Sequence, residues 1–258
     1  MQYTQERFGR GIEEINIALI GDTHTGHPNY REYIVDDVLE EITSRKNGRI
    51  FFMGDLTEIA LTTTYGSTYE QILTPEEQVD YWVEKIRPHL DIVVGAVAGN
   101  HNQRIVNQVG MNPLRLIFKI LQAPEKFLGY SAVIKWAFNK GCIHSRHWHG
   151  ATSARTNAGI LRKIKQMGNN VDVDINCMGH THRLITDDID ITKYPDARNM
   201  NLHTKRKDYI NTGSALGWDD GYAEMKDMDE VLLGFPIIKM WGEKGKQRVQ
   251  IDKITFQD

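Results

Sequence analysis

The sequence predicts an α/β fold in which a parallel sheet is accompanied by a second, mixed sheet. Over residues 15–100, short apolar runs alternate with segments of helical periodicity. Alternation of this kind implies parallel strands joined by right-handed helical crossovers. From residue 130 onwards the pattern changes to a hairpin, one helix and then mostly strands and turns as far as Phe256, which adds antiparallel pairing.

Three apolar runs in the first half are predicted to be the parallel strands. They read INIALI (15–20), RIFFMGD (49–55) and DIVVGAVAGN (91–100). Between the first two, the segment 30–46 carries Ile34, Val38 and Ile42 at the spacing of one helix face. This segment is therefore predicted to be the first crossover helix.

The second crossover helix is predicted over 74–90. Thr74 is a suitable N-cap, Pro75 suits the first helical position, and acidic residues follow in the first turn. The preceding segment, 56–73, has no convincing period. Because a loop of that length is uncommon in a compact domain, we expect it to be functional or mobile.

The second half begins with a predicted hairpin over 130–150, whose two strands flank an Asn-Lys-Gly turn. A helix is predicted over 153–167 and a strand over 172–179. The sequence contains no internal repeat, no low-complexity tract and no clear linker. We therefore expect a single domain spanning residues 1–258.

The overall composition is that of an ordinary globular protein. Of its 258 residues, 40% are hydrophobic and 25% charged, and the net charge of -3 provides no general basic field for nucleic acid. Two cysteines do not make a disulfide framework, so a reducing cytoplasm is expected. No secretory h-region opens the chain and no apolar run approaches the ~18 residues of a membrane helix, so no membrane partner is expected.

Polar side chains gather where the predicted strands end. They are Asp22, His24, Asp55, Asn100, His101, His149, His180 and His182. Since a strand places residues i and i+2 on one face, Asp22 and His24 are expected to point the same way. Ligands bind at the carboxyl ends of strands in open α/β sheets, so we expect these residues to form one cluster.

The donor types favour a particular chemistry. Imidazole mixed with oxygen suits Mn, Fe, Zn or Ni better than Mg or Ca, and the set is large enough for two ions with Asp55 as a natural bridge. Two ions roughly 3.5–4 Å apart can hold a bridging hydroxide and clamp a phosphate. One histidine would remain free to protonate the leaving oxygen. Any one of these residues alone could be a strand-end cap, but the joint pattern favours metal binding.

The ordered motifs GDTH, GD, GNH, HG and GHTH, within about residues 15–215, resemble the calcineurin-like metallophosphoesterase superfamily. The segment DTHTG and the compact size are most similar to the DNA-repair nuclease branch and to small phage phosphoesterases. The resemblance implies a four-layer fold, a mixed-sheet β-sandwich flanked by helices, around a binuclear metal site.

Carried over by residue, the resemblance implies two ligand sets. The first ion would be held by Asp22, His24 and His182, and the second by Asn100, His149 and His180. Asp55 would bridge both ions, and His101 would be the general acid. Asn102 stands where the family usually has Asp or Glu. Because an amide carries no charge, we expect the protonated form of His101 to be less well stabilised than it is beside a carboxylate.

Three further residues are candidates for substrate contact. Arg104 could pair with a phosphate, although a surface salt bridge explains it equally well. Arg155 and Asn157 lie near a predicted helix N-terminus, a place suited to anions. His147 would share its strand face with His149, which leaves an exchange of ligands open. His149 is preferred because the family's motif has a glycine after this ligand.

The function favoured by the sequence is that of a binuclear metal-dependent phosphoesterase. It would most readily be a phosphodiesterase that acts on nucleic acid or nucleotides, with attack by a metal-bridged hydroxide and His101 as general acid. The cofactors would be two divalent transition-metal ions, with Mn first and Fe, Ni or Zn as alternatives. The expected partner is the phosphodiester, a homodimer is left open, and the expected location is the cytoplasm, that of the host if the protein is phage-encoded.

Three alternatives remain. The first is a phosphodiesterase for cyclic or other signalling nucleotides. The second is a protein phosphatase, which is less favoured because the chain lacks an obvious peptide-docking insert. The third is a catalytically inactive metal-binding scaffold subunit. Asn102 points toward inactivity, whereas the presence of every expected ligand argues against it.

Overall fold

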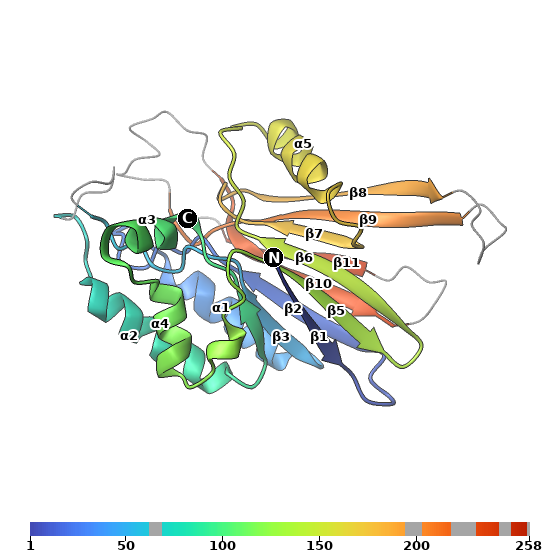
Figure 1. Ribbon diagram of the computed structural model, residues 1–258, viewed down its shortest axis with the longest axis horizontal. Coiled ribbons are helices and arrows are strands. Elements are labelled where there is room, and N and C mark those ends of the chain that lie inside the picture. Colours follow the sequence, from blue (N-terminus) through green and yellow to red (C-terminus); the bar gives the residue numbers. More distant parts are fainter. Residues whose placement is uncertain (62–68, 194–202, 218–230, 243–248, 257–258) are drawn as a thin grey trace.

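The computed structural model describes residues 1–61, 69–193, 203–217, 231–242 and 249–256. Two mixed sheets pack face to face, with helices on their outer sides (Figure 1). The apolar residues between the sheets include Leu19 and Phe51 from one sheet and Trp136 and Ile175 from the other, all fully buried. The expected β-sandwich flanked by helices is therefore confirmed.

The five-stranded sheet has the order β11-β10-β2-β3-β4. Its strands are β2 (Glu14–Ile20), β3 (Gly48–Phe52), β4 (Val93–Ala96), β10 (Leu233–Trp241) and β11 (Val249–Phe256). The pairs β2–β3 and β3–β4 are parallel, as predicted, and β10 joins β2 antiparallel. Strand β3 ends three residues before Asp55, so this residue lies in a loop rather than at the end of the predicted strand.

Helices cover the outer face of this sheet. They are α1 (Glu32–Ser44), α2 (Pro75–Ile86), α3 (Asn100–Val109) and α4 (Pro113–Ile120), with the short 3-10 turns η1 (Arg87–His89) and η2 (Pro124–Lys126). The predicted cap of α2 is confirmed, because the Thr74 side chain accepts from the Glu77 N–H and Glu77 accepts in return from the Thr74 N–H. Helix α3 was not predicted, because its sequence NHNQRIVNQV offers only a short apolar face.

The six-stranded sheet has the order β1-β5-β6-β7-β9-β8. Its strands are β1 (Gln2–Arg7), β5 (Ser131–Phe138), β6 (Gly141–Trp148), β7 (Ile175–Met178), β8 (Leu184–Lys193) and β9 (His203–Thr212). The predicted hairpin is confirmed as β5–β6. Helix α5 (Asn157–Gly168) covers the outer face of this sheet, and it begins four residues later than predicted, with Thr156 as its cap.

No helix of the described residues is both long enough and apolar enough to cross a bilayer.

Candidate metal centre

The candidate ligands lie in turns that follow the strands, and most of these turns use left-handed backbone. Of the eight non-glycine residues with positive φ in the described part of the chain, five belong to the predicted site. They are Asp22, His24, Asp55, His180 and His182. Such conformations cost free energy and collect at functional sites. The expectation that strand alternation aligns Asp22 and His24 is therefore wrong, because both residues lie beyond the end of β2 and a left-handed turn orients them.

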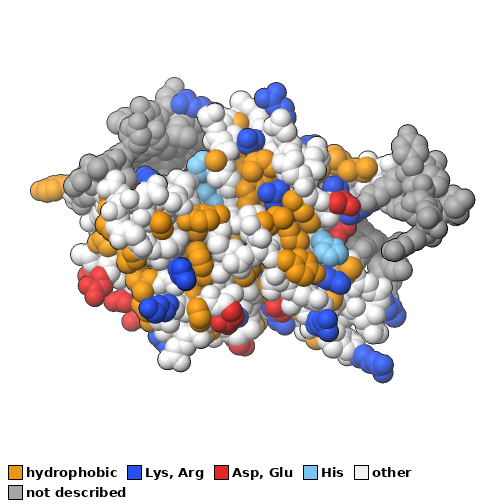
Figure 2. Space-filling view, viewed as in Figure 1, with side chains coloured by type: hydrophobic (Ala, Val, Ile, Leu, Met, Phe, Trp, Pro, Cys, Tyr) orange, Lys and Arg blue, Asp and Glu red, His pale blue; other side chains and the backbone are white. Residues whose placement is uncertain are grey.

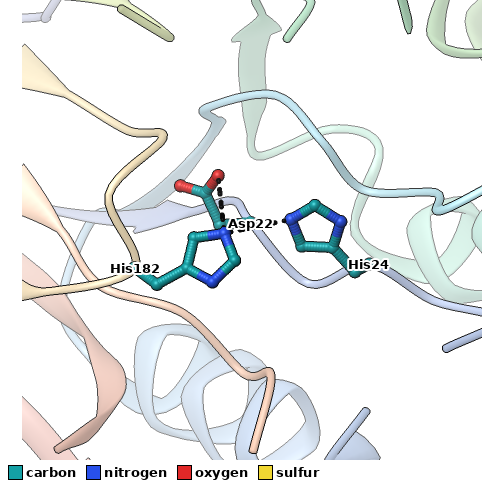
Figure 3. Close-up of side chains that lie close together, drawn as sticks. All are labelled: Asp22, His24 and His182. Carbon is teal, nitrogen blue, oxygen red and sulfur yellow. Dashed lines mark hydrogen bonds and ion pairs between the residues drawn. The ribbon is translucent and has the colours of Figure 1, made fainter. Parts of the chain in front are cut away.

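The structure brings Asp22, His24 and His182 together as a first candidate ligand group (Figure 3). The Nε2 atoms of His24 and His182 lie 3.2 Å apart. The Nε2 atom of His182 lies 3.8 Å from Asp22 Oδ1, a buried oxygen without a hydrogen-bond partner. Two ring nitrogens and an unpaired carboxylate oxygen thus face a common point, an arrangement that suits a cation.

The second group forms around His149. Its Nε2 lies 2.9 Å from Asp55 Oδ2 and 3.0 Å from Asn100 Oδ1. Nδ1 of His180 lies 2.8 Å from the same Asn100 oxygen. The structure therefore brings Asn100, His149 and His180 together, as the resemblance implied.

The two groups share a carboxylate. Asp22 Oδ1 lies 3.7 Å from His149 Nε2 as well as 3.8 Å from His182 Nε2, so Asp22 contacts histidines of both groups. The Asp55 carboxylate contacts His149 and accepts from the backbone N–H of His101 at 3.0 Å. Its role as the bridging ligand stays a prediction.

A glycine makes room for this arrangement. A Cβ atom added to Gly99 would lie 2.0 Å from Asp55 Oδ1 and 2.8 Å from the backbone nitrogen of Asp55. No side chain can occupy that position without displacing the carboxylate. The glycine of the GNH motif therefore lets the loop before α3 close over Asp55.

The buried charges of the site perturb one another. Burial, with a smaller contribution from the Asp55 carboxylate, outweighs the opposing effect of His149 and raises the pKa of Asp22 to about 6. Burial by itself would lower the pKa of His149, but Asp55 and Asp22 outweigh it and raise this pKa to about 9. Burial would likewise raise the pKa of Asp55, which His149 and His101 instead hold well below its usual value. The His149 imidazole and the carboxylates of Asp22 and Asp55 therefore shift one another's pKa values.

The residues fit a pair of divalent cations. Buried carboxylates are stable only when cations compensate them, and a metal ion can take over this role from a proton on His149. His180 and His182 are available as neutral ligands, because burial lowers the pKa of His180 to about 4 and, with His24 nearby, also lowers the pKa of His182. Neutral imidazoles with carboxylate and amide oxygens are the donor set expected for transition ions.

Glu58 is a site residue that the sequence analysis missed. Its Oε2 lies 2.6 Å from His24 Nδ1 and 3.2 Å from His101 Nδ1. Burial would raise the pKa of Glu58, but hydrogen bonds from His101 and His24 outweigh it and hold this pKa far below the usual value. A signal was present, because Glu58 follows Asp55 by three residues and opens the segment 56–73 that was expected to be functional.

The structure places the Asn102 side chain at the start of α3. Its side-chain oxygen accepts from the backbone N–H of Gly99 at 2.9 Å, so Asn102 caps the first turn of α3. The carboxylate beside the His101 ring comes from Glu58 instead. The replacement of the usual acid by Asn102 therefore does not leave His101 without a charged partner.

The three candidate substrate-contact residues differ in burial and in their position along the chain. Arg104 is half-buried on α3, and Arg155 is exposed just before α5. The side-chain oxygen of Asn157 accepts from Arg183 Nη1 at 3.1 Å, which ties the start of α5 to the residue after His182. Contact of Arg104, Arg155 and Asn157 with a substrate stays a prediction.

The structure separates His147 from the metal centre. Its ring lies 4.2 Å from that of Phe51 in the core between the sheets, and its Nε2 lies 2.7 Å from Ser145 Oγ. Burial lowers the pKa of His147 to about 3. An exchange of ligands between His147 and His149 therefore does not fit this fold.

The candidate site reaches the surface through some of its histidines, among them His101 and His182. The side chains of His101 and His182 are 17% and 31% exposed, whereas those of His24 and His149 are almost fully buried. In the space-filling view, histidine side chains are visible between the positions that α3 and α5 occupy in Figure 1 (Figure 2). A substrate could therefore approach His101 and His182 while the deeper ligands remain shielded.

No protein-family model and no curated protein matches this chain. Among solved structures, it is similar to Vps29 from Chaetomium thermophilum, with 20% identity, a TM-score of 0.45 and coverage of 93% of this chain and 96% of that chain. It is also similar to Vps29 complexed with Zn²⁺ from Entamoeba histolytica (18%, TM-score 0.42, 94% and 99% covered). A metallophosphoesterase from Sphaerobacter thermophilus is similar as well (15%, TM-score 0.43, 94% and 89% covered). Similarity at this level assigns neither an activity nor a substrate.

Proposed function

We propose that this protein is a binuclear metal-dependent phosphoesterase that hydrolyses a phosphodiester of nucleic acid or a nucleotide. The observation that carries the proposal is the junction of two ligand groups through Asp22, with His101 beside them. The groups Asp22–His24–His182 and Asp22–Asp55–His149 each bring their donor atoms within 4.8 Å of one another. Sites of this kind suit phosphoryl chemistry because two adjacent cations can hold one phosphate.

The two ions would be held by the residues that the motifs indicate. Asp22, His24 and His182 would hold the first, Asn100, His149 and His180 the second, and Asp55 both. Bound divalent ions lower the pKa of water and neutralise phosphate charge. Mn²⁺ is the first choice for these nitrogen and oxygen donors, and Fe, Ni and Zn are compatible with them.

His101 is the proposed proton donor to the leaving oxygen. Its backbone N–H donates to Asp55 Oδ1, which fixes the start of α3 against the metal centre. Its ring nitrogen Nδ1 faces the Glu58 carboxylate at 3.2 Å, which leaves Nε2 to carry the transferable proton. The Glu58 carboxylate beside Nδ1 orients the ring of this proposed general acid.

A phosphodiester is proposed over a monoester because the DTHTG segment resembles the nuclease branch of the metallophosphoesterases. Arg104 and Arg155 are the proposed contacts to substrate phosphates, as guanidinium groups can pair with phosphate in a bidentate manner. A cytoplasmic protein of phage type is the proposed setting. Signalling nucleotides and phosphoproteins are the other substrate classes that the experiment must separate.

A catalytically inactive metal-binding scaffold is the competing proposal. Asn102 was the one feature that pointed to inactivity, and its side chain caps α3. Every ligand type expected for two ions is present in the described residues, together with a charged partner for His101.

The test is hydrolysis by metal-stripped protein to which Mn²⁺, Ni²⁺, Zn²⁺ or Mg²⁺ is returned. Bis(p-nitrophenyl) phosphate reports diester hydrolysis and p-nitrophenyl phosphate reports monoester hydrolysis. We expect Mn²⁺ to restore diester turnover, Asp55→Ala to abolish it, and His101→Ala to lower kcat by about 10²–10⁴-fold. His89→Ala is the matched control. His89 lies on η1, which precedes the N-terminal end of β4, whereas the candidate site lies beyond the C-terminal end of that strand.

Each result has a definite consequence. Faster turnover of the monoester would contradict the diester proposal and favour a phosphatase. Activity restored by Mn²⁺ would next be tested on single-stranded DNA, RNA and cyclic dinucleotides. Absence of turnover in protein that binds two ions would overturn the enzymatic proposal and favour a scaffold.

A further inference from the structure

Two glutamine side chains hold the loop that carries Glu58. The backbone N–H of Ile59 donates to Gln78 Oε1 at 3.0 Å. The next residue, Ala60, is held by Gln71, because its N–H donates to Gln71 Oε1 at 2.9 Å and its carbonyl accepts from Gln71 Nε2 at 3.3 Å. The loop is therefore fixed immediately after Glu58 by side chains distant from it in sequence.

The two amides also bind each other. Gln78 Nε2 donates to Gln71 Oε1 at 2.9 Å and to the carbonyl of Leu73 at 3.0 Å. Gln78 lies on α2 and is completely buried. A buried polar side chain is stable only when its donors and acceptors are paired, and here both ends of the amide are used. A carboxylate at this position would lose the donor, and an apolar side chain would lose both functions.

The same glutamine packs beneath the loop that carries His24. A Cβ atom added to Gly26 would lie 2.2 Å from Gln78 Nε2, so the Gly26 backbone rests directly on the amide. The N–H of Glu58 donates to the carbonyl of Thr25 at 3.0 Å, and that of Ile72 donates to the carbonyl of Gly26 at 3.0 Å. Gln78 thus lies at the junction of the loops that bear His24 and Glu58.

The backbone around Glu58 needs such support. Ile59 has φ of 38°, a left-handed conformation that is strained for a β-branched residue. The hydrogen bond from Ile59 to Gln78 offsets this strain and fixes the chain direction just after Glu58. A small change in that direction would move the carboxylate, which lies within 3.2 Å of both His24 Nδ1 and His101 Nδ1.

We propose that Gln78 is a positioning residue that sets Glu58, and through it the orientation of His24 and His101, with Gln71 as its support. This inference rests on the proposed function. Partners that orient a metal-binding imidazole change metal affinity by 10–100-fold when they are removed. Gln78 does not contact an imidazole itself but acts through Glu58, so its loss is expected to weaken Mn²⁺ binding by about tenfold, the lower end of that range.

The experiment measures binding of Mn²⁺ to the metal-stripped full chain by isothermal titration calorimetry. The variants are Gln78→Met, which keeps the volume and removes both hydrogen-bonding functions, and Glu58→Gln. The matched control is Gln250→Met, because the Gln250 side chain is exposed on β11 and bonds only locally to Asp252. We expect about tenfold weaker binding for Gln78→Met and unchanged binding for Gln250→Met.

A double-mutant cycle separates positioning from general stability. If Gln78 acts through Glu58, adding Gln78→Met to Glu58→Gln causes no further loss of affinity. Additive losses, or an affinity of Gln78→Met equal to that of the wild type, would overturn the inference and leave the proposed function intact. Wild-type protein that binds none of Mn²⁺, Fe²⁺, Ni²⁺ and Zn²⁺ would overturn the proposed function and this inference with it.

A milder variant guards against misfolding. Gln71→Met removes the hydrogen bonds to Ala60 at a half-buried position and is expected to weaken Mn²⁺ binding two- to fivefold. If Gln78→Met does not fold, this variant decides the question: wild-type affinity in Gln71→Met would overturn the inference. Where turnover is measurable, the effect should fall on kcat rather than on KM, because the glutamines do not touch the substrate.

Discussion

His101 Nδ1 and Glu58 Oε2 lie 3.2 Å apart, and the same carboxylate oxygen lies 2.6 Å from Nδ1 of His24. One carboxylate therefore orients both the imidazole of a candidate metal ligand and that of the proposed general acid. In each ring the bond at Nδ1 leaves Nε2 directed away from Glu58. Glu58 thus links the candidate metal centre to the proposed proton donor, and with His24 and His101 it forms a third group of residues that could hold a metal ion.

The first prediction concerns Glu58→Gln. The amide keeps the size of the side chain but removes the carboxylate that faces Nδ1 of both His101 and His24. We expect kcat for bis(p-nitrophenyl) phosphate to fall about 10–100-fold and Mn²⁺ binding to weaken as well. Steady-state kinetics at saturating Mn²⁺ separate the two effects. Wild-type kcat in this variant would show that Glu58 is only structural.

The second prediction concerns Asn102→Ala. The substitution removes the acceptor for the Gly99 N–H and with it the cap of α3. The expected loss is about 1 kcal/mol of unfolding free energy, which lowers Tm by about 2–4 °C. The accompanying fall in kcat should be much smaller than that of Glu58→Gln. Asn107→Ala, at the far end of the same helix, is the control, and a larger kinetic effect for Asn102→Ala than for Glu58→Gln would contradict the assignment.

Local sequence patterns predicted most of the parallel sheet, the cap of α2 and the β5–β6 hairpin. Each of these depends on interactions between near neighbours, such as the reciprocal bonds of Thr74 and Glu77. Helix α3 was not predicted, because packing of Ile105 and the Asn102 cap stabilise it and it has no long apolar face. Strand β1 pairs with β5 more than a hundred residues away, a contact that no local pattern contains.

The sequence predicted which residues belong to the candidate site, but it did not predict their hydrogen-bond partners or backbone conformations. Ordered motifs placed Asp22, His149 and the other ligands in one cluster. The partner of His101 was not predictable, because Glu58 reaches it from a segment without periodicity. The left-handed turns at Asp22 and His24 could not be predicted from the sequence either, since neither residue type requires a positive φ.

The third prediction concerns Asp22→Asn in the metal-free protein. The folded-state pKa of Asp22 is raised to about 6, so the ionised carboxylate destabilises the fold above its unfolded pKa of 3.8, and fully so above pH 6. Removing that charge should stabilise metal-free protein at pH 8 by about 1–3 kcal/mol while it weakens metal binding. Thermal unfolding with and without chelator measures both effects. An Asp22→Asn protein that is less stable than the wild type in chelator would contradict the prediction.

The last prediction concerns pH and His149. Its folded-state pKa is raised from 6.5 to about 9, so the charged imidazole contributes stability that is fully present below pH 6.5 and is lost as pH rises through 9. In chelator, the Tm difference between wild type and His149→Asn should therefore shrink over this window, from about 5 °C or more. Mn²⁺ must displace the same proton, so its affinity should rise over the same window, by up to about tenfold per pH unit. His144→Asn, a histidine on the β6 strand away from the centre, controls for general pH effects. A Tm difference that does not change between pH 6.5 and 9 would show that His149 does not carry the charge that balances Asp22 and Asp55.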